Sequence, residues 1–144
     1  MSETQPLCYE FRGAISAGDF QYAENMLAQN PELISLENGL GETVLHFLAV
    51  ENDLGGVAWL FAKGALLDVK NKFGDPVIFE VASLAYKELL LWFKRHGADF
   101  NVKGGDGESL LEHLIELENM IDSGDMPGFE KNDMVEWLSK IIQT

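Results

Sequence analysis

The stretch Asn38-Gly-Leu-Gly-Glu-Thr-Val-Leu-His46 decides the fold, because the same frame returns twice further along the chain. Its glycine recurs at a constant step, as Gly41, Gly74 and Gly107 (74 − 41 = 33, 107 − 74 = 33), and this step is called the repeat interval below. A fixed period of about 20–50 residues is typical of a solenoid of stacked units. The other positions that keep the repeat interval are Asn38 with Asn71, Leu45 with Ile78 and Leu111, Ala49 with Ala82, Trp59 with Trp92, and Gly64-Ala65 with Gly97-Ala98.

Within this period the residues resemble the ankyrin repeat. That family's unit runs from a turn through Gly-x-Thr-Pro-Leu-His into a first helix, then through Gly-His into a second helix that ends in Gly-Ala-Asp-x-Asn. The second unit supplies Gly41-Glu-Thr-Val-Leu-His46, and the third closes with Gly97-Ala-Asp-Phe-Asn101. The resemblance implies an all-α solenoid of about four helix-turn-helix units, with short β-hairpin fingers and atypical caps at both ends.

We therefore expect one ankyrin-repeat domain over residues 1–144, with units at approximately 5–37, 38–69, 70–102 and 103–144. The first unit predicts two helices within residues 7–30 and no hairpin before them. The third unit departs from the pattern, because Pro76 stands where Thr43 does and Phe79-Glu80 replaces the His-Leu of the family. The fourth unit predicts a long first helix, a loop over residues 122–128 and a final helix from about Glu130.

Charge and composition limit the classes of partner that the protein is expected to bind. The chain has 144 residues, of which 47% are hydrophobic, and a net charge of −14 (10 − 24). Such a field repels phosphate backbones and anionic lipids, so we expect neither nucleic acid nor membrane as a partner. The acidity is also what a soluble, monomeric protein carries. No signal-peptide pattern opens the sequence, which favours a cytoplasmic location, although an exported effector with an uncleaved signal has the same appearance.

No constellation in the sequence indicates catalysis, a cofactor or a metal. The resemblance explains His46 as the structural histidine beside Thr43, bonded to the backbone of adjacent fingers. His113 next to Glu112 is common on solvated helices, and Cys8 in a first helix favours a buried apolar role. The acidic loop over residues 122–133 lacks the spacing of a calcium site. We expect a non-enzymatic protein.

The concave groove is the surface that the resemblance singles out, since finger tips and outer positions of first helices line it in ankyrin stacks. We expect Leu40 and Phe73 to be exposed anchors on adjacent fingers, or alternatively to fold down and brace their own loops. Around them lie acidic residues, opposed by Lys72 alone. The candidate partner-binding residues are Leu40, Glu42, Glu51, Lys72, Phe73, Asp75, Leu84, Asp106, Glu108 and Glu116.

These features predict a protein–protein interaction module that holds a basic protein against an acidic concave face, with inhibition of that protein as one role. A narrower version is similar, in size and charge, to bacterial immunity proteins or antitoxins that neutralise a cognate toxin. The rival hypothesis is a scaffold or assembly factor in a larger complex, which uses the convex back or the C-terminal cap. Steered binding weakens with salt and an apolar scaffold contact does not, so ionic strength separates the two.

Overall fold

The computed structural model describes residues 5–142. Among them it contains helices and no strand, apart from one isolated antiparallel bridge between Lys70 and Pro76. The predicted all-helical class is therefore confirmed. The elements are α1 (Gln5–Ser16), α2 (Phe20–Gln29), the 3-10 helix η1 (Pro31–Ile34), α3 (Val44–Val50), α4 (Leu54–Ala62), α5 (Val77–Ser83), α6 (Lys87–Arg95), α7 (Leu110–Asp122) and α8 (Met134–Ile141).

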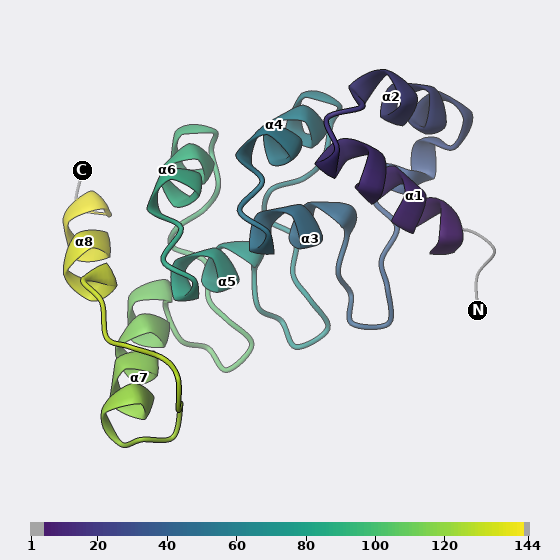
Figure 1. Ribbon diagram of the computed structural model, residues 1–144. Coiled ribbons are helices and arrows are strands. Elements are labelled where there is room, and N and C mark those ends of the chain that lie inside the picture. The colour runs from purple at the N-terminus through teal and green to yellow at the C-terminus, as the bar shows by residue number, and fades with distance from the viewer. Residues whose placement is uncertain (1–4, 143–144) are drawn as a thin grey trace.

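Consecutive helices pack in pairs, and the pairs follow one another along the molecule. α1 packs on α2, α3 on α4, α5 on α6 and α7 on α8. The first members of the pairs also contact each other in order, α1 with α3, α3 with α5, and α5 with α7. Figure 1 shows the two resulting rows, with the loops that precede α3, α5 and α7 projecting below the lower row. Those three loops are called the finger loops below, and comprise residues 38–42, 71–75 and 104–108.

The predicted β-hairpins are not seen in the described residues. Each finger loop is instead a tight turn closed by two backbone hydrogen bonds of the same kind. In the first, the Asn38 N–H donates to the Glu42 carbonyl and the Gly41 N–H donates to the Asn38 carbonyl, both at 3.0 Å. The same two bonds recur in residues 71–75 and 104–108. Two bonds close a turn, but a strand needs a longer ladder, and the chain enters a helix or a loop before one can form.

Asparagine side chains hold the first two finger loops in shape. The Asn38 Oδ1 accepts hydrogen bonds from the N–H groups of Leu40 (2.8 Å) and Glu42 (3.0 Å). Asn71 does the same one repeat interval later, with Phe73 and Asp75 as donors. This is the asparagine turn in which a side-chain oxygen replaces a backbone acceptor. The third loop has Gly104 at this position and lacks these bonds.

Neighbouring finger loops touch through their backbones. The Lys72 N–H donates to the Leu40 carbonyl at 2.8 Å, and the Gly105 N–H donates to Asp75 Oδ1 at 2.9 Å. Gly41 has φ of 75°, and a Cβ there would lie 2.8 Å from the Lys72 nitrogen. A Cβ on Gly105 would overlap the Phe73 carbonyl oxygen. Glycine is therefore required where one finger meets the next.

The core runs through all the helix pairs, and alanine allows the closest approach between them. Ala49 and Ala82, which are separated by the repeat interval (82 − 49 = 33), are both fully buried in the first helices of their pairs. At the C-terminal end, Leu138 of α8 is fully buried. The largest fully buried side chains are Phe11, Phe79, Phe93, Ile15, Leu33, Leu45, Leu48, Leu60, Ile78, Leu89, Leu90 and Leu110.

The final helix begins later than the sequence predicts, at Met134 instead of near Glu130. Residues 130–133 are exposed and bring no apolar side chain to the core. The Asn132 side chain accepts a hydrogen bond from the Met134 N–H at 3.0 Å, which favours a turn before the helix. The prediction of a start near Glu130 is therefore wrong.

The break between the two helices of a pair uses a left-handed residue. Gly18, Asn52 and Ala85 take this place in the first three pairs, with φ of 79°, 60° and 61°. Glycine adopts this conformation without strain and asparagine tolerates it, but alanine does not. The third pair therefore carries local backbone strain at Ala85.

Replacing Ala85 with glycine is expected to stabilise the protein. A left-handed backbone costs alanine about 1–2 kcal/mol, and the extra entropy that glycine loses on folding costs about 0.5–1 kcal/mol, so the free energy of unfolding should rise by up to about 1.5 kcal/mol. Chemical denaturation measures this change. Ala58→Gly, in the helical backbone of α4, is the matched control and should lower the free energy of unfolding by about 1 kcal/mol. A loss of stability for both variants would contradict the strain at Ala85.

Candidate functional site

The apolar side chains at the tips of the first two finger loops, Leu40 and Phe73, are exposed. Phe73 is 63% exposed and Leu40 is 45% exposed, so neither side chain is folded into its own loop. The Lys72 ammonium lies 5.2 Å from the centroid of the Phe73 ring, a cation–π contact at the tip of the second finger loop. Because the Lys72 backbone also bonds to Leu40, the two tips lie next to each other.

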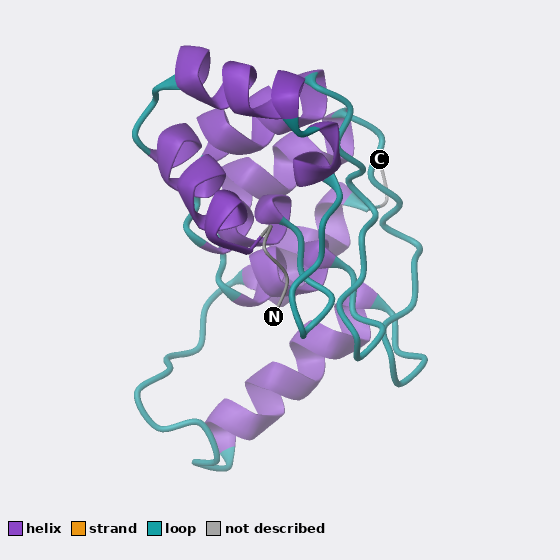
Figure 2. Cartoon of the chain, turned by 90° about the vertical axis from the view of Figure 1, so that its right-hand side faces the viewer, coloured by secondary structure: helices purple, strands orange, loops and turns teal. Residues whose placement is uncertain are grey.

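Four of the predicted acidic residues meet at one hollow between the last two finger loops and α7. Asp75, Asp106, Glu108 and Glu116 line it. The remaining lining residues are His113, Leu117 and Met120. Figure 2 shows the finger loops on one side and α7 reaching out on the other. We call this region the acidic hollow.

The carboxylates of the acidic hollow form no ion pair among residues 5–142. The ion pairs lie elsewhere, mostly on the outer helices and the C-terminal cap: Lys63 with Glu24, Lys87 with Asp133, Lys131 with Asp122, and Lys140 with Glu136. Asp75 is engaged, since its carboxylate accepts the Gly105 N–H and joins the last two finger loops. Asp106 and Glu116 are exposed, and no hydrogen bond of their side chains is found in the described residues.

Glu80 of α5 belongs with this surface, although the sequence analysis did not propose it. Its carboxyl is partly buried, and burial raises its pKa, with further contributions from the negative charges of Glu42 and Asp75. No hydrogen bond or ion pair of this carboxyl is found within residues 5–142. The signal was present, since Glu80 stands where the repeat pattern has leucine. Glu80 therefore lies near the carboxylates of the first two finger loops.

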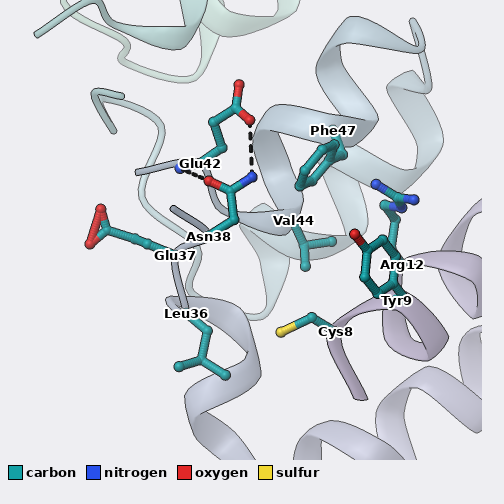
Figure 3. A pocket seen from close by; sticks show the side chains of 9 residues that line it. All are labelled: Cys8, Tyr9, Arg12, Leu36, Glu37, Asn38, Glu42, Val44 and Phe47. Atoms are coloured by element: carbon teal, nitrogen blue, oxygen red, sulfur yellow. Dashed lines mark hydrogen bonds between the residues drawn. The ribbon is translucent and has the colours of Figure 1, made fainter. Parts of the chain in front are cut away.

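A second hollow lies at the N-terminal end and was not predicted. It is mostly apolar and lies between α1, the segment before the first finger loop and the start of α3. Figure 3 shows Cys8 and Val44 pointing into its middle, and Glu37 pointing away. We call it the N-terminal pocket, and its lining residues are Cys8, Tyr9, Arg12, Leu36, Glu37, Asn38, Glu42, Val44 and Phe47.

The structure does not bring every predicted residue to these hollows. Glu51 and Leu84 are exposed, but they follow the C-terminal ends of α3 and α5 and line neither hollow. Glu42 lines the N-terminal pocket rather than the acidic hollow, and its Oε1 accepts a hydrogen bond from Asn38 Nδ2 at 3.1 Å. Cys8 is only partly buried, although it packs against the core. The prediction of a buried Cys8 is therefore wrong.

His46 has a structural position, as expected, but its bonding differs from the expectation. The ring is 1% exposed, and its Nδ1 accepts the Thr43 N–H at 3.0 Å within the same finger-to-helix junction. The other nitrogen, Nε2, has no partner in the described residues, so the expected bond to an adjacent finger is absent there. Burial lowers the His46 pKa, and the nearby charges of Glu42 and Glu37 oppose this shift.

The sequence pattern predicts a solvated helix face for His113, but in the structure His113 lies against another helix. Its Nε2 is 3.0 Å from the Ser83 Oγ, and its ring centroid is 5.0 Å from that of Phe79. The histidine thus bridges α7 to α5 while one side of it faces the acidic hollow. Contacts across the helix row are not encoded in the local sequence, and this explains the difference.

The described residues contain no group of three or more His, Cys, Asp or Glu side chains arranged to hold a metal ion. Within residues 5–142, no helix combines the length and the apolar character that crossing a bilayer requires. A comparison with family models finds no match to this chain. A comparison with curated proteins finds no significant relative either.

Replacing His46 with alanine is expected to lower the free energy of unfolding by about 2–4 kcal/mol, because a buried hydrogen bond and ring packing are both lost. The loss should depend on pH. The His46 pKa is lower in the folded state than the ordinary histidine value of about 6.5. The neutral ring therefore contributes fully to the free energy of unfolding above about pH 6.5, and this contribution decreases as the pH falls through the folded-state pKa. Denaturation of the wild type and the variant at a series of pH values measures this. A difference between them that stays constant from about pH 8 to 5 would contradict the assigned role.

Proposed function

We propose that this protein is a non-enzymatic, monomeric interaction module, a solenoid of ankyrin-type units whose acidic concave face binds a basic protein. The solenoid interpretation is supported by the constant repeat interval, the consecutive packing of helix pairs and the repeated closure of the finger loops. Repeat scaffolds of this kind present extended surfaces rather than closed pockets, which favours binding over catalysis.

The observation that carries the proposal is the acidic hollow. Its carboxylates lack ion-pair partners in the described part of the chain, and Lys72 is the only cation among the proposed contact residues. Like charges gathered in a concave surface focus the field and attract the opposite charge. A basic partner would relieve this repulsion, whereas an acidic partner or a phosphate backbone would increase it.

The mechanism has two steps that different residues perform. The negative field first steers the partner and raises the association rate. The exposed side chains of Phe73 and Leu40 are then buried against the partner, which slows dissociation. A bound module would cover the basic surface of its partner, so inhibition is the natural outcome. Neutralisation of a cognate toxin, as by an immunity protein or antitoxin, is the narrower form of this proposal.

The alternative is a scaffold that binds through its convex back or its C-terminal cap. Exposed apolar side chains there, such as Leu66 at 74% and Phe129 at 53%, favour this second candidate. They lie away from the acidic hollow and line neither hollow described above. A contact made through them would respond little to salt, whereas contact through the acidic hollow would weaken strongly.

Charge reversal in the acidic hollow tests the proposal. Asp106→Lys with Glu116→Lys is expected to slow association with the partner by about tenfold or more, because two exposed carboxylates that steer it become cations. Asp75 is left intact because it joins two finger loops. The partner is first isolated from native cells with the wild-type protein and identified by mass spectrometry. Association rates are then measured at low and high ionic strength.

Glu88→Lys with Glu130→Lys is the matched control, since it changes the net charge equally at exposed positions outside both hollows. It should keep most of the wild-type association rate. Isolation of no basic protein, or equal rates for the hollow variant and the control, would contradict binding at the acidic hollow.

Phe73→Ala tests the anchoring step separately. Loss of a buried aromatic anchor is expected to speed dissociation by about tenfold while association changes little. Leu66→Ala removes an apolar side chain that is 74% exposed and lines neither hollow, and it should leave dissociation unchanged. The scaffold alternative predicts the reverse result for these two variants.

A further inference from the structure

The N-terminal pocket is an apolar cavity that opens beside the proposed binding face. Cys8, Leu36, Val44 and Phe47 supply apolar walls, and Figure 3 shows them around a common space. Among the described residues, α1 borders the first finger loop at this end of the molecule and supplies one wall of the pocket. A cavity with these walls suits one aliphatic or aromatic side chain rather than a charged one.

Arg12 places a positive charge in the lining of the N-terminal pocket. Its guanidinium lies 4.4 Å from the Phe47 ring centroid and 5.1 Å from that of Tyr9. No ion pair of Arg12 is found in residues 5–142. The lining also includes the carboxylates of Glu37 and Glu42, so the preference of the pocket for an uncharged side chain rests on its apolar walls.

Glu80 lies near one carboxylate of the pocket and one carboxylate of the acidic hollow. Glu42 lines the pocket and also lies close enough to Glu80 to raise its pKa. Asp75 lines the acidic hollow and acts on Glu80 in the same way. Phe47, Glu80 and His113 follow one another at the repeat interval (80 − 47 = 33, 113 − 80 = 33) on α3, α5 and α7. Along the helix row, these equivalent positions are apolar at Phe47 and acidic at Glu80, and His113 lines the acidic hollow.

We propose that this face binds an extended basic segment of the partner, which places one apolar side chain in the N-terminal pocket, one basic side chain over Glu80 and a second in the acidic hollow. This inference rests on the proposed function and specifies which kind of partner segment the face binds. Charge complementarity selects the basic residues, and the pocket selects the apolar one.

The geometry of the helix row sets the spacing between the three side chains. Packed helices lie about 8–10 Å apart, so two steps along the row from the α1–α3 junction to the α5–α7 junction span about 16–20 Å. An extended chain covers about 3.3 Å per residue, so this span takes about six residues. The segment therefore has an apolar residue with basic residues about three and six positions away.

Synthetic peptides test the spacing directly. The probes are fluorescein-labelled Leu-Ser-Ser-Arg-Ser-Ser-Arg, flanked by Gly-Ser, and the same sequence reversed, because the chain direction is open. Two comparison peptides have leucine replaced by serine, or both arginines moved next to leucine. We expect the better direction to bind in fluorescence anisotropy, and each comparison peptide to bind about tenfold more weakly, as the loss of a buried leucine or of a charge contact implies. Equal binding of all peptides, or no binding in either direction at low salt, would overturn the proposal.

Cys8 reports on the pocket in the unaltered protein, because it is the only cysteine in the chain. The leucine peptide at saturation is expected to slow maleimide labelling of Cys8 by about fivefold or more, at about pH 8.5 where enough thiolate forms. The serine peptide at the same concentration should not slow it. Unchanged labelling with bound leucine peptide would place that side chain elsewhere and reject the pocket.

Two variants separate this inference from the proposed function. Cys8→Phe fills the pocket and should weaken the leucine peptide about tenfold to the level of the serine peptide, while Cys8→Ala, which leaves the pocket open, should not. Asp106→Lys with Glu116→Lys should weaken both peptides. Sensitivity to the charge reversal alone would overturn the segment proposed here and leave the acidic face standing. Insensitivity to both would overturn the two proposals together.

Discussion

The contact between successive finger loops is the constraint on which the rest of the binding face depends. One backbone hydrogen bond, from the Lys72 N–H to the Leu40 carbonyl, joins the first two loops. The Asp75 carboxylate joins the second to the third through the Gly105 N–H. Glycine at these junctions lets the loops approach to backbone distance. The exposed tips and the carboxylates between them consequently lie in a row, although they are far apart in the sequence.

Placing acidic residues on such a row has an energetic consequence. The carboxylates at the acidic hollow have no ion-pair partner in the described residues, and like charges that line one surface repel one another. Burial is the main cause of the raised pKa of the Glu80 carboxyl, and the negative charges of Glu42 and Asp75 raise it further. In the proposed function, this surface attracts a basic partner. The apolar pocket at Arg12 then gives the face two chemically different ends.

The sequence predicts much of this architecture, because the repeat interval fixes which positions are equivalent. The helical class, the finger positions and the exposure of Leu40 and Phe73 follow from it. What it misses arises where units meet in space. The bond between His113 and Ser83 links different helices, and the pocket around Cys8 is lined by residues of α1, of α3 and of the segment before the first finger loop. Asp75 looked like a free contact residue, but it joins two loops.

Hydrogen exchange at single amides is the most direct measurement of the finger-to-finger contact. The amides of Lys72 and Gly105 are on exposed loops, yet each donates a hydrogen bond to the neighbouring loop. The Asp106 amide is equally exposed, and the structure gives it no acceptor within the described residues. The account predicts slow exchange at Lys72 and Gly105 and fast exchange at Asp106. Equally fast exchange at all three would mean that the loops are not joined, and the continuous acidic face would be contradicted.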